Sequence, residues 1–334
     1  MAVKVAINGL GRIGKCVARI MADRDDVELV AANASGTDEM IQYGLRYDTV
    51  HGNRNDVIVK DGYITIGKQK AKLLSERDPA KIDFASYGAE IVLECTGAFL
   101  TKESVQAYLD NGVKKVIFSA PAKDDTATFV LGVNESTYNG EAVISNASCT
   151  TNGLAPIVKA LDDAFGIEKA LMTTIHSYTS SQPILDAKDK KDPRKARAGA
   201  LNLSPTTTGA AKAIGKVLPH LNGKINGQSV RVPTPNVSMI DLTATLNRNI
   251  TLDEVKQVFI DAQNGNLKGI LAVDTEYRVS SDFNGETNST VVLLDTIQVI
   301  GGNMVKVLSW YDNEWGYSTR LVDMAVYISI TGNK

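Results

Sequence analysis

The sequence has few cysteines and histidines and no long apolar run, and each of these shortages excludes a class of protein. Cys16, Cys95 and Cys149 are too widely spaced for a disulfide framework or a close metal-ligand pair, and the three histidines stand singly. We therefore expect no metal site and a reducing, cytoplasmic location. No run approaches membrane-spanning length, and the first residues pass into a strand without the apolar core of a signal peptide, so no membrane association is expected.

The charge balance excludes a polyanion-binding protein. The chain has 36 basic and 38 acidic residues, which give a formal net charge of −2, and it has no basic patch interleaved with aromatic residues. Nucleic acid is therefore not an expected partner. The 334 residues, of which 43% are apolar, exceed what one hydrophobic core usually organises, so we expect a globular chain of two domains.

A glycine-rich turn near the N-terminus predicts dinucleotide binding. Gly9, Gly11 and Gly14 form the pattern Gly-x-Gly-x-x-Gly between an expected strand at residues 4–8 and a helical pattern. In such a turn the first glycine allows a tight bend, the second lets the backbone approach a pyrophosphate, and the third lets the helix pack on the strand. The next expected strand, residues 27–33, follows at the spacing of a βαβ unit, which favours this interpretation over a merely structural turn.

The end of that second strand leaves the choice between NAD and NADP open. An NAD site usually has a carboxylate there that binds the ribose 2′-hydroxyl, whereas this chain has no acidic residue from Asn33 to Thr37. A small, polar turn at this place would admit a 2′-phosphate. In the alternative interpretation NAD binds with a weaker ribose anchor, or Asp38 replaces the missing carboxylate.

The alternation of later strands and helices predicts the fold class. Further strands are expected at residues 56–59, 63–66, 91–95, 115–118 and 142–144, with a helix at 102–111. Such alternation builds a doubly wound sheet whose carboxyl edge, here with the turns at Thr96 and Ser119, binds ligands. We expect an α/β protein with an N-terminal Rossmann-type dinucleotide-binding domain of residues 1–148 plus 313–334, to which a C-terminal helix returns. Residues 149–312 should form an α+β catalytic domain with a mostly antiparallel sheet.

Cys149 is the strongest candidate nucleophile. It follows an expected strand and precedes a helical pattern at residues 153–161, so it should lie at or near a helix N-terminus, where free N–H groups and the helix dipole favour a thiolate. Cys16 and Cys95 are expected to be small buried hydrophobes. His176 ends a further expected strand, and beside a helix-start cysteine it is a candidate base.

Two segments of the second half carry side chains suited to anions. Residues 204–211 are threonine-rich and should form a turn that opens a helix, and Arg231 begins the segment 231–236. Hydroxyls, helix N–H groups and an arginine fork suit phosphate, although a helix cap and a structural ion pair are alternative interpretations. The very polar residues 180–202 should form a loop, and loops of such length are uncommon unless functional.

Taken together, the motifs resemble the family of phosphorylating glyceraldehyde-3-phosphate dehydrogenases, the tetrameric type of bacteria and eukaryotes, from end to end. The most specific motifs are INGLGRIG at 7–14, SNASCTTN at 145–152, HSYT at 176–179, RVPTPN at 231–236 and WYDNEWGY at 310–317. The resemblance implies that Cys149 attacks the aldehyde and that His176 accepts its proton as hydride passes to the nicotinamide. Inorganic phosphate then cleaves the thioester to give 1,3-bisphosphoglycerate, a step of glycolysis and gluconeogenesis.

The resemblance also implies roles for residues at matching positions. The substrate's phosphate would be held by Thr179 and Arg231, and the attacking phosphate by Ser148, Thr150, Thr208 and Gly209. Asn313 would grip the nicotinamide carboxamide. The other cofactor contacts implied are Gly9, Gly11, Arg12, Ile13, Gly14, Ala34, Arg77, Thr96, Ser119, Lys188 and Tyr317. The loop at 180–202 matches one that reaches a neighbouring subunit's cofactor, which implies a homotetramer.

Departures from the family pattern concern the cofactor and the phosphates. Ala34 stands where NAD-specific members have aspartate, and Ala187-Lys188 replaces Leu-Pro. Both changes remove features that crowd or repel a 2′-phosphate, so NADP use is expected, alone or beside NAD. Ser180-Ser181 replaces Asn-Asp. Lys195 replaces a frequent arginine, and the lysine would hold phosphate as a point charge, whereas an arginine would hold it as a fork. Gly153 replaces a common cysteine, so the oxidised nucleophile lacks a nearby resolving thiol.

Two other functions stay open at this point. One is a related dehydrogenase of the same superfamily that acts on erythrose 4-phosphate. The other is a cofactor-binding interaction protein that has lost catalysis, against which the intact Cys149, His176, Arg231 and Asn313 speak.

Overall fold

The structure, a computed structural model, describes residues 2–189 and 192–331, which divide into two compact units. The first unit comprises Met1–Phe129, Glu135–Ser148 and Ser318–Lys334, and the second comprises Val130–Asn134 and Cys149–Tyr317. Relative to the expected domains, residues 130–134 and 313–317 belong to the second unit. The parts of our expectations that concern residue 1, residues 190–191 of the long loop and residues 332–334 lie outside the described residues.

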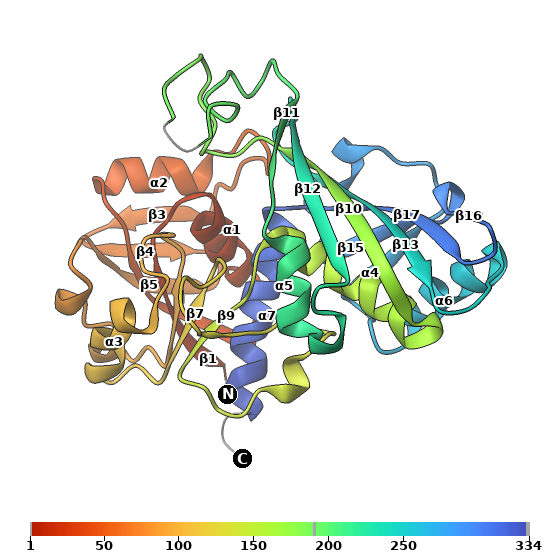
Figure 1. The fold of residues 1–334 in the computed structure, drawn as a ribbon. Helices are drawn as coiled ribbons and strands as arrows, with labels where there is room; N and C mark the ends of the chain where they lie inside the picture. Colours follow the sequence, from red (N-terminus) through yellow and green to blue (C-terminus); the bar gives the residue numbers. More distant parts are fainter. Residues whose placement is uncertain (1, 190–191, 332–334) are drawn as a thin grey trace. The chain divides into compact units, whose positions relative to one another are not determined.

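The first unit is built on a nine-stranded sheet in the order β3-β4-β5-β2-β1-β6-β7-β9-β8 (Figure 1). Its strands are β1 (Val3–Asn8), β2 (Val27–Asn33), β3 (Val57–Lys60), β4 (Tyr63–Ile66), β5 (Gln69–Leu74), β6 (Ile91–Glu94), β7 (Lys115–Phe118), β8 (Ala127–Thr128) and β9 (Val143–Ser145). The seven neighbouring strands β5, β2, β1, β6, β7, β9 and β8 run parallel, and the pairs β3/β4 and β4/β5 are antiparallel. The chain thus crosses repeatedly back to the same edge, which is the doubly wound arrangement expected from the sequence.

The helices of the first unit follow the βαβ logic of that sheet. They are α1 (Arg12–Met21), α2 (Asp38–Arg46), α3 (Lys102–Asp110) and the part of α7 (Trp315–Thr331) from Ser318 onward. Strands covered on both faces are mostly apolar, and all four residues of β6, including the terminal Glu94, are buried. The core beside β6 and β7 includes Phe84 and Tyr108, whose rings meet edge to face with centroids 5.5 Å apart.

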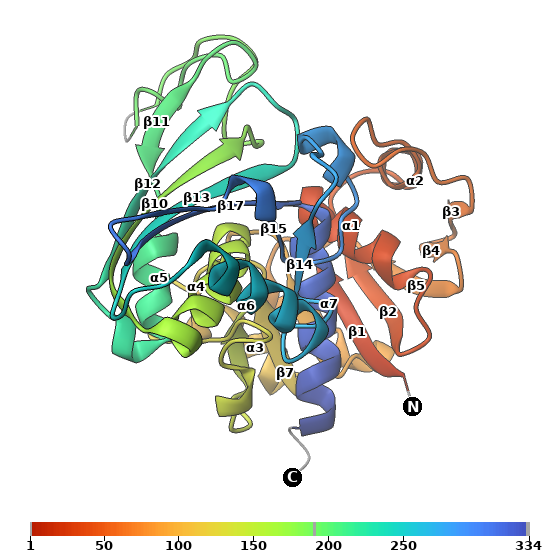
Figure 2. The same cartoon turned by 90° about the vertical axis from the view of Figure 1, so that its right-hand side faces the viewer.

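The second unit contains an eight-stranded, mostly antiparallel sheet (Figure 2). Its strands are β10 (Ile167–Ser177), β11 (Ser204–Thr207), β12 (Ile225–Val232), β13 (Ser238–Leu246), β14 (Leu271–Asp274), β15 (Thr290–Leu293), β16 (Gln298–Ile300) and β17 (Met304–Tyr311). The pairs β10/β12 and β14/β15 are parallel, and the remaining pairs are antiparallel. The helices α4 (Cys149–Phe165), α5 (Ala210–Val217) and α6 (Leu252–Asn264) pack against this sheet.

Alternating burial along β13 explains how the second sheet presents polar groups on one face and packs on the other. From Ser238 to Leu246 every second residue is buried, as expected for a strand with one core-facing side. The expected fold class, a Rossmann-type unit plus an α+β unit with a mostly antiparallel sheet, is confirmed. Among the described residues no helix has both the length and the apolar character needed to cross a membrane.

Several local expectations differ from the structure. Cys95 was expected inside its strand, but β6 ends at Glu94 and Cys95 is only partly buried in the turn that follows. The threonine-rich segment was expected to be a turn, whereas residues 204–207 form β11 through antiparallel pairing with β12. Helix α2 was missed, although Thr37 caps it by accepting a hydrogen bond from the Met40 N–H. Cys16 is buried as expected.

Candidate active site

The glycine turn of the first unit has the geometry that its sequence predicts. Gly9 has a φ of +96°, and a Cβ placed there would lie 2.8 Å from the Thr96 Cγ2 atom. A Cβ at Gly14 would overlap the Gly9 carbonyl oxygen, so the helix can approach the strand only because Gly14 lacks a side chain. At Gly11 a Cβ would meet no atom within 4 Å, which leaves the N-terminus of α1 open. An open helix N-terminus suits a pyrophosphate.

A cleft of about 380 Å³ opens beside this turn within the first unit. Its lining brings together the ends of β1, β2 and β5 and the turn after β6. The lining residues are Asn8, Gly9, Leu10, Gly11, Asn33, Ala34, Ser35, Glu76, Arg77, Ile82, Thr96 and Phe99. Of the cofactor residues expected from the sequence, this cleft joins Gly9, Gly11, Ala34, Arg77 and Thr96. A narrow, partly apolar cleft next to an open helix N-terminus fits the adenosine part of a dinucleotide.

Polar residues that line this cleft are hydrogen-bonded to a buried carboxylate that the sequence analysis missed. Glu94 accepts hydrogen bonds from Asn8 Nδ2 at 2.7 Å and from the Thr96 N–H at 2.9 Å, and the Thr96 hydroxyl also donates to it. Asn8 Oδ1 in turn accepts from Asn33 Nδ2 at 2.8 Å. Burial raises the pKa of Glu94, although its hydrogen bonds oppose that shift. This hydrogen-bond network connects the ends of β1, β2 and β6 beside the cleft.

Three other expected cofactor residues occupy different surroundings. The Arg12 guanidinium lies 2.6 Å from a carboxylate oxygen of Asp48, so its side chain is engaged by the protein itself. The pKa of Asp48 is lowered to about 2, because the hydrogen bonds from Arg12 and from two backbone N–H groups outweigh its burial. Ile13 is half-buried in the first turn of α1, and Ser119 follows β7, where its N–H donates to the Glu94 carbonyl.

Cys149 is the first residue of α4, as the sequence predicts. The turn before it contains Ala147 in the left-handed region at a φ of +56°, a conformation that costs a non-glycine residue free energy and that is frequent at functional sites. Ser145 holds the turn, because its hydroxyl donates to the Ala120 carbonyl and accepts from the Ala147 N–H. Ser148 is partly buried in the same turn.

Strand β10 places His176 beside the cysteine. The His176 Nε2 atom lies 3.6 Å from Cys149 Sγ. The other ring nitrogen, Nδ1, lies 2.7 Å from the Ser177 carbonyl oxygen and 2.8 Å from Arg231 Nη1. A carbonyl only accepts, so the tautomer with hydrogen on Nδ1 donates to Ser177 and leaves Nε2 free to take the thiol proton. In the other tautomer Arg231 donates to Nδ1, and the Nε2 hydrogen points toward the sulfur.

Burial and one cation set the charges at this pair. Burial raises the pKa of the Cys149 thiol, and the Arg231 cation acts in the opposite direction. Burial and the Arg231 cation together lower the pKa of His176 to about 3, so the imidazole is neutral and can accept a proton. The pair is therefore a thiol beside a neutral imidazole, with the Arg231 cation near any negative charge that develops.

Tyr311 packs against His176 and is hydrogen-bonded to the residue that follows Cys149. Its ring packs edge to face against His176, with centroids 6.0 Å apart, and its hydroxyl lies 3.0 Å from Thr150 Oγ1 and 2.8 Å from Thr174 Oγ1. The same ring fills the space next to Gly153, where a Cβ would lie 3.1 Å from Tyr311 Cγ. The Tyr311 hydroxyl thus fixes the Thr150 side chain by a hydrogen bond, and the Thr150 hydroxyl is also 4.0 Å from Cys149 Sγ.

The remaining anion-binding candidates come from β12, from the loop after β10 and from the start of α5. Arg231 is the last but one residue of β12 and is paired in register with His176 of β10. Thr179 Oγ1 lies 2.8 Å from Ser181 Oγ, so a hydroxyl pair stands where the family pattern has a threonine and a carboxylate. Thr208 Oγ1 accepts from the Ala210 N–H at the start of α5. Gly209, the residue that precedes α5, is exposed. Lys188 is exposed in the loop.

The segment after β17 contains two further expected cofactor residues, Asn313 and Tyr317, both buried. Asp312 shapes this turn, because its carboxylate accepts from the N–H groups of Glu314 and Trp315 at the start of α7. Asn313 Oδ1 accepts a 2.8 Å hydrogen bond from Ser238, a serine that the sequence analysis did not identify. Nothing in the sequence around Ser238 marks it, since the pairing joins residues 75 positions apart.

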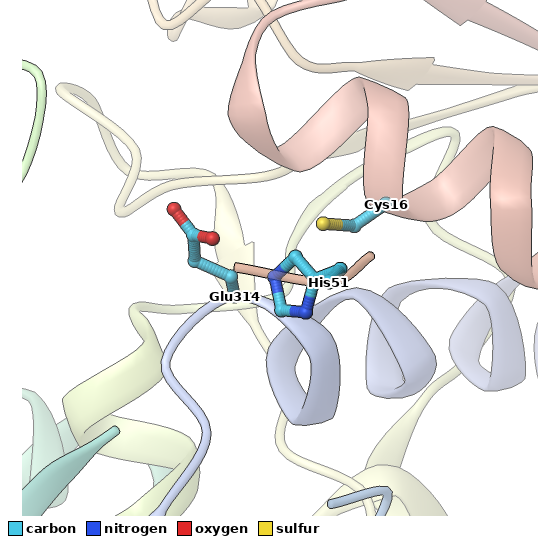
Figure 3. A group of neighbouring side chains, drawn as sticks. All are labelled: Cys16, His51 and Glu314. Carbon is cyan, nitrogen blue, oxygen red and sulfur yellow. The ribbon is translucent and has the colours of Figure 1, made fainter. Parts of the chain in front are cut away.

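Within each unit, the described residues bring few potential transition-metal ligands close together. In the first unit Cys16, on α1, and His51 offer ligand atoms within 4.8 Å of one another, and Figure 3 shows their side chains with Cys16 projecting from the helix. Two donors do not complete the three or four protein ligands of a usual transition-metal site. Among the described residues, neither unit by itself gathers three such groups.

Comparisons with known proteins cover nearly the whole chain. Residues 3–102 match the family domain described as glyceraldehyde 3-phosphate dehydrogenase, NAD binding domain, and residues 148–313 match the C-terminal domain of the same family. Relatives include glyceraldehyde-3-phosphate dehydrogenases of Priestia megaterium, 49% identical, and of Bacillus subtilis, 50% identical, each alignment spanning 99% of this chain and all of the relative. A relative of the same name from the fungus Claviceps purpurea is 49% identical over 98% of both chains.

Proposed function

This chain belongs to the glyceraldehyde-3-phosphate dehydrogenase family, and we propose that it oxidises and phosphorylates D-glyceraldehyde 3-phosphate to 1,3-bisphosphoglycerate with NAD(P). The observation that supports this most directly is the 3.6 Å approach of His176 Nε2 to Cys149 Sγ at the start of α4. A thiol at a helix start, a neutral imidazole beside it and a partly buried arginine are the parts of a covalent acyl-transfer site.

The first step is the addition of the Cys149 sulfur to the aldehyde carbon. As the carbon–sulfur bond forms, the thiol proton passes to His176 Nε2, and the carbonyl becomes an alkoxide, which His176 then protonates to give the hemithioacetal. The backbone N–H of Cys149 and the imidazole stabilise the alkoxide. Tyr311 keeps the imidazole in place through its ring contact.

Oxidation and phosphate attack follow at the same carbon. His176 removes the hydroxyl proton of the hemithioacetal while the carbon loses a hydride, and the product is a thioester on Cys149. NAD(P)⁺, when bound, would accept the hydride. An oxygen of inorganic phosphate then attacks the thioester carbon, the carbon–sulfur bond breaks, and the sulfur leaves as a thiolate that takes the proton held by His176. The thioester retains the energy of the oxidation that hydrolysis would waste, so the site must admit phosphate and exclude water.

The phosphate contacts follow from the hydroxyls and the cation around the cysteine. We assign the substrate's own phosphate to Thr179 and Arg231, and the attacking phosphate to Ser148, Thr150, Thr208 and Gly209. Support comes from the position of Arg231, whose Nη1 donates to the Ser177 carbonyl beside His176, and from the open backbone at Gly209. Ser181 supplies a hydroxyl rather than a negative charge next to Thr179, which removes a repulsion from a bound phosphate.

The cofactor part of the proposal rests on the cleft of the first unit. Its residues and the N-terminus of α1 would hold the adenosine and the pyrophosphate, with Asn313 and Tyr317 directed to the nicotinamide. Ala34 and Ser35 line the cleft at the place of the usual ribose-binding carboxylate, so NADP use, alone or beside NAD, is part of the proposal. Lys188 would add positive charge near the 2′-phosphate.

Quaternary structure and location complete the proposal. We propose a homotetramer whose contacts include the loop at 180–202, because Ile184 and Leu185 in its described part are 86% and 76% exposed and would be covered by a neighbouring subunit. Light scattering of the purified chain measures this directly. A cytoplasmic location agrees with the three free cysteines, and cell fractionation tests it.

Steady-state kinetics test the activity. The chain should reduce NAD(P)⁺ with glyceraldehyde 3-phosphate only when phosphate or arsenate is present, and it should do so faster than with erythrose 4-phosphate. A higher kcat/KM with erythrose 4-phosphate would instead identify the related dehydrogenase. No turnover with either aldehyde would contradict the proposed activity and favour a non-catalytic cofactor-binding protein.

A further inference from the structure

Ser238 is buried and links the strand that carries His176, the proposed base, to Asn313, the residue expected to bind the nicotinamide. It begins β13, and only 1% of it is exposed. Its Oγ accepts the Ser177 N–H at 3.1 Å, directly after His176, and donates to Asn313 Oδ1 at 2.8 Å. One hydroxyl therefore connects the strand that carries the base to the amide expected to bind the cofactor.

The hydroxyl has one proton and two lone pairs, which limits how Asn313 can be oriented. The Ser177 N–H occupies one lone pair, and the Ser238 proton is directed to Asn313 Oδ1. An amide turned by 180° would set its NH₂ group against this hydroxyl proton and would leave the proton without its acceptor, which is unfavourable in a buried place.

The orientation of the amide decides what Asn313 can recognise. With Oδ1 bound to Ser238, the Nδ2 group remains to donate to a carbonyl oxygen, and the residue is 5% exposed, so its position is firmly constrained. The carbonyl of a primary carboxamide is such an acceptor. Starting from the proposed function, we propose that Ser238 is a positioning residue that locks the Asn313 amide, so that its Nδ2 binds the nicotinamide carboxamide oxygen and one face of the ring receives hydride.

Three variants separate positioning from general stability. Ser238→Ala removes the hydroxyl, Ser238→Thr keeps it, and Ser309→Ala is the matched control. Ser309 lies in the neighbouring strand β17, is fully buried, and has a hydroxyl without a hydrogen-bond partner among the described residues. Comparable Tm values for Ser238→Ala and Ser309→Ala would show that both fold, and Ser238→Thr reports on the hydroxyl if Ser238→Ala does not fold.

The first readout is equilibrium binding, which requires no turnover. We expect Ser238→Ala to weaken binding of NAD(P)⁺ about tenfold, the effect of losing one oriented hydrogen bond of about 1.4 kcal/mol. It should not weaken binding of an analogue whose carboxamide is replaced by hydrogen, since that analogue has no carbonyl for Asn313. Ser238→Thr and Ser309→Ala should bind both as the unaltered chain does. Equal losses for both ligands in Ser238→Ala would overturn the positioning role.

The second readout is the face of the nicotinamide that receives hydride. Oxidation of C1-deuterated glyceraldehyde 3-phosphate by the unaltered chain should deuterate one face of the reduced ring, and Ser238→Ala should deuterate both. Full selectivity in Ser238→Ala, with unchanged binding, would overturn the proposal. If the unaltered chain binds NAD(P)⁺ but turns over no aldehyde, the proposed activity fails, while the binding comparison still decides the role of Ser238.

Discussion

The Nε2 atom of His176 lies 3.6 Å from the Sγ atom of Cys149, although 27 positions separate the two residues in the chain. Their approach depends on two elements of the second unit. Helix α4 begins at Cys149, and strand β10 ends one residue after His176. The buried Tyr311 contacts both the imidazole and, through Thr150, the first turn of the helix. The reactive pair is therefore fixed by the fold rather than by a loop.

The base role predicts a large and specific effect of removing the imidazole. His176→Asn should lower kcat by about 10²–10⁴-fold, because the thiol and the hemithioacetal lose their proton acceptor. Pre-steady-state measurement of cofactor reduction tests this. The matched control is His220→Asn, because His220 is exposed and pairs with Asp162 at 2.5 Å, away from the cysteine. Equal kcat values for His176→Asn and the unaltered chain would remove the imidazole from the mechanism.

Arg231 should shift the pH dependence of cysteine reactivity. Its cation lowers the pKa of Cys149 against the effect of burial, so Arg231→Gln should raise that pKa. The rate of alkylation by a neutral reagent, which follows the thiolate, should then move to higher pH, and at a fixed pH below the pKa it should fall. Mass spectrometry of the Cys149 peptide isolates this site from the other cysteines. The exposed Arg248, paired with Glu254, provides the control Arg248→Gln, whose profile should not move.

The ribose end of the cofactor cleft predicts the cofactor preference. Ala34→Asp should lower kcat/KM with NADP by tenfold or more and raise kcat/KM with NAD, because the new carboxylate would repel a 2′-phosphate and accept from a 2′-hydroxyl. Kinetics with the two cofactors side by side, for the chain and for this variant, measure it. A large NAD preference of the unaltered chain would contradict the interpretation of Ala34 and Lys188.

Peroxide treatment should oxidise Cys149 without an internal disulfide. Gly153, one turn further along α4, offers no sulfur, and the Tyr311 ring occupies the space beside it. We therefore expect a sulfinic or sulfonic acid, or a mixed disulfide when a small thiol is present. Peptide mass spectrometry of the native protein checks this, and an intramolecular disulfide at Cys149 would show the expectation to be wrong.

The features that the sequence predicted are those encoded within short segments. The glycine turn needs only strand, three glycines and helix, and its requirements at Gly9 and Gly14 are visible in the backbone. The helix start at Cys149 follows from a polar frame between two apolar patterns. Both are local, so periodicity and spacing suffice to predict them.

The features that the sequence did not predict are pairings between distant segments. Glu94 meets Asn8 across 86 positions, and Ser238 meets Asn313 across 75. Each looks like an ordinary polar residue at a strand end until the topology places the two ends together. Pairing also decided β11, where antiparallel hydrogen bonds to β12 outweigh the turn-forming tendency of the threonine-rich segment. The ion pair of Arg12 with Asp48 likewise depends on the position of the loop that follows α2.

The covalent intermediate on Cys149 tests the central claim most directly. The purified chain should be mixed with glyceraldehyde 3-phosphate and NAD(P)⁺ without phosphate, quenched in acid and examined by peptide mass spectrometry, with Cys149→Ser as the control that still binds cofactor. The account predicts an acyl group on the Cys149 peptide that disappears on addition of inorganic phosphate while acyl phosphate forms. Cofactor reduction without any acyl group on Cys149, or an acyl group that phosphate does not release, would contradict it.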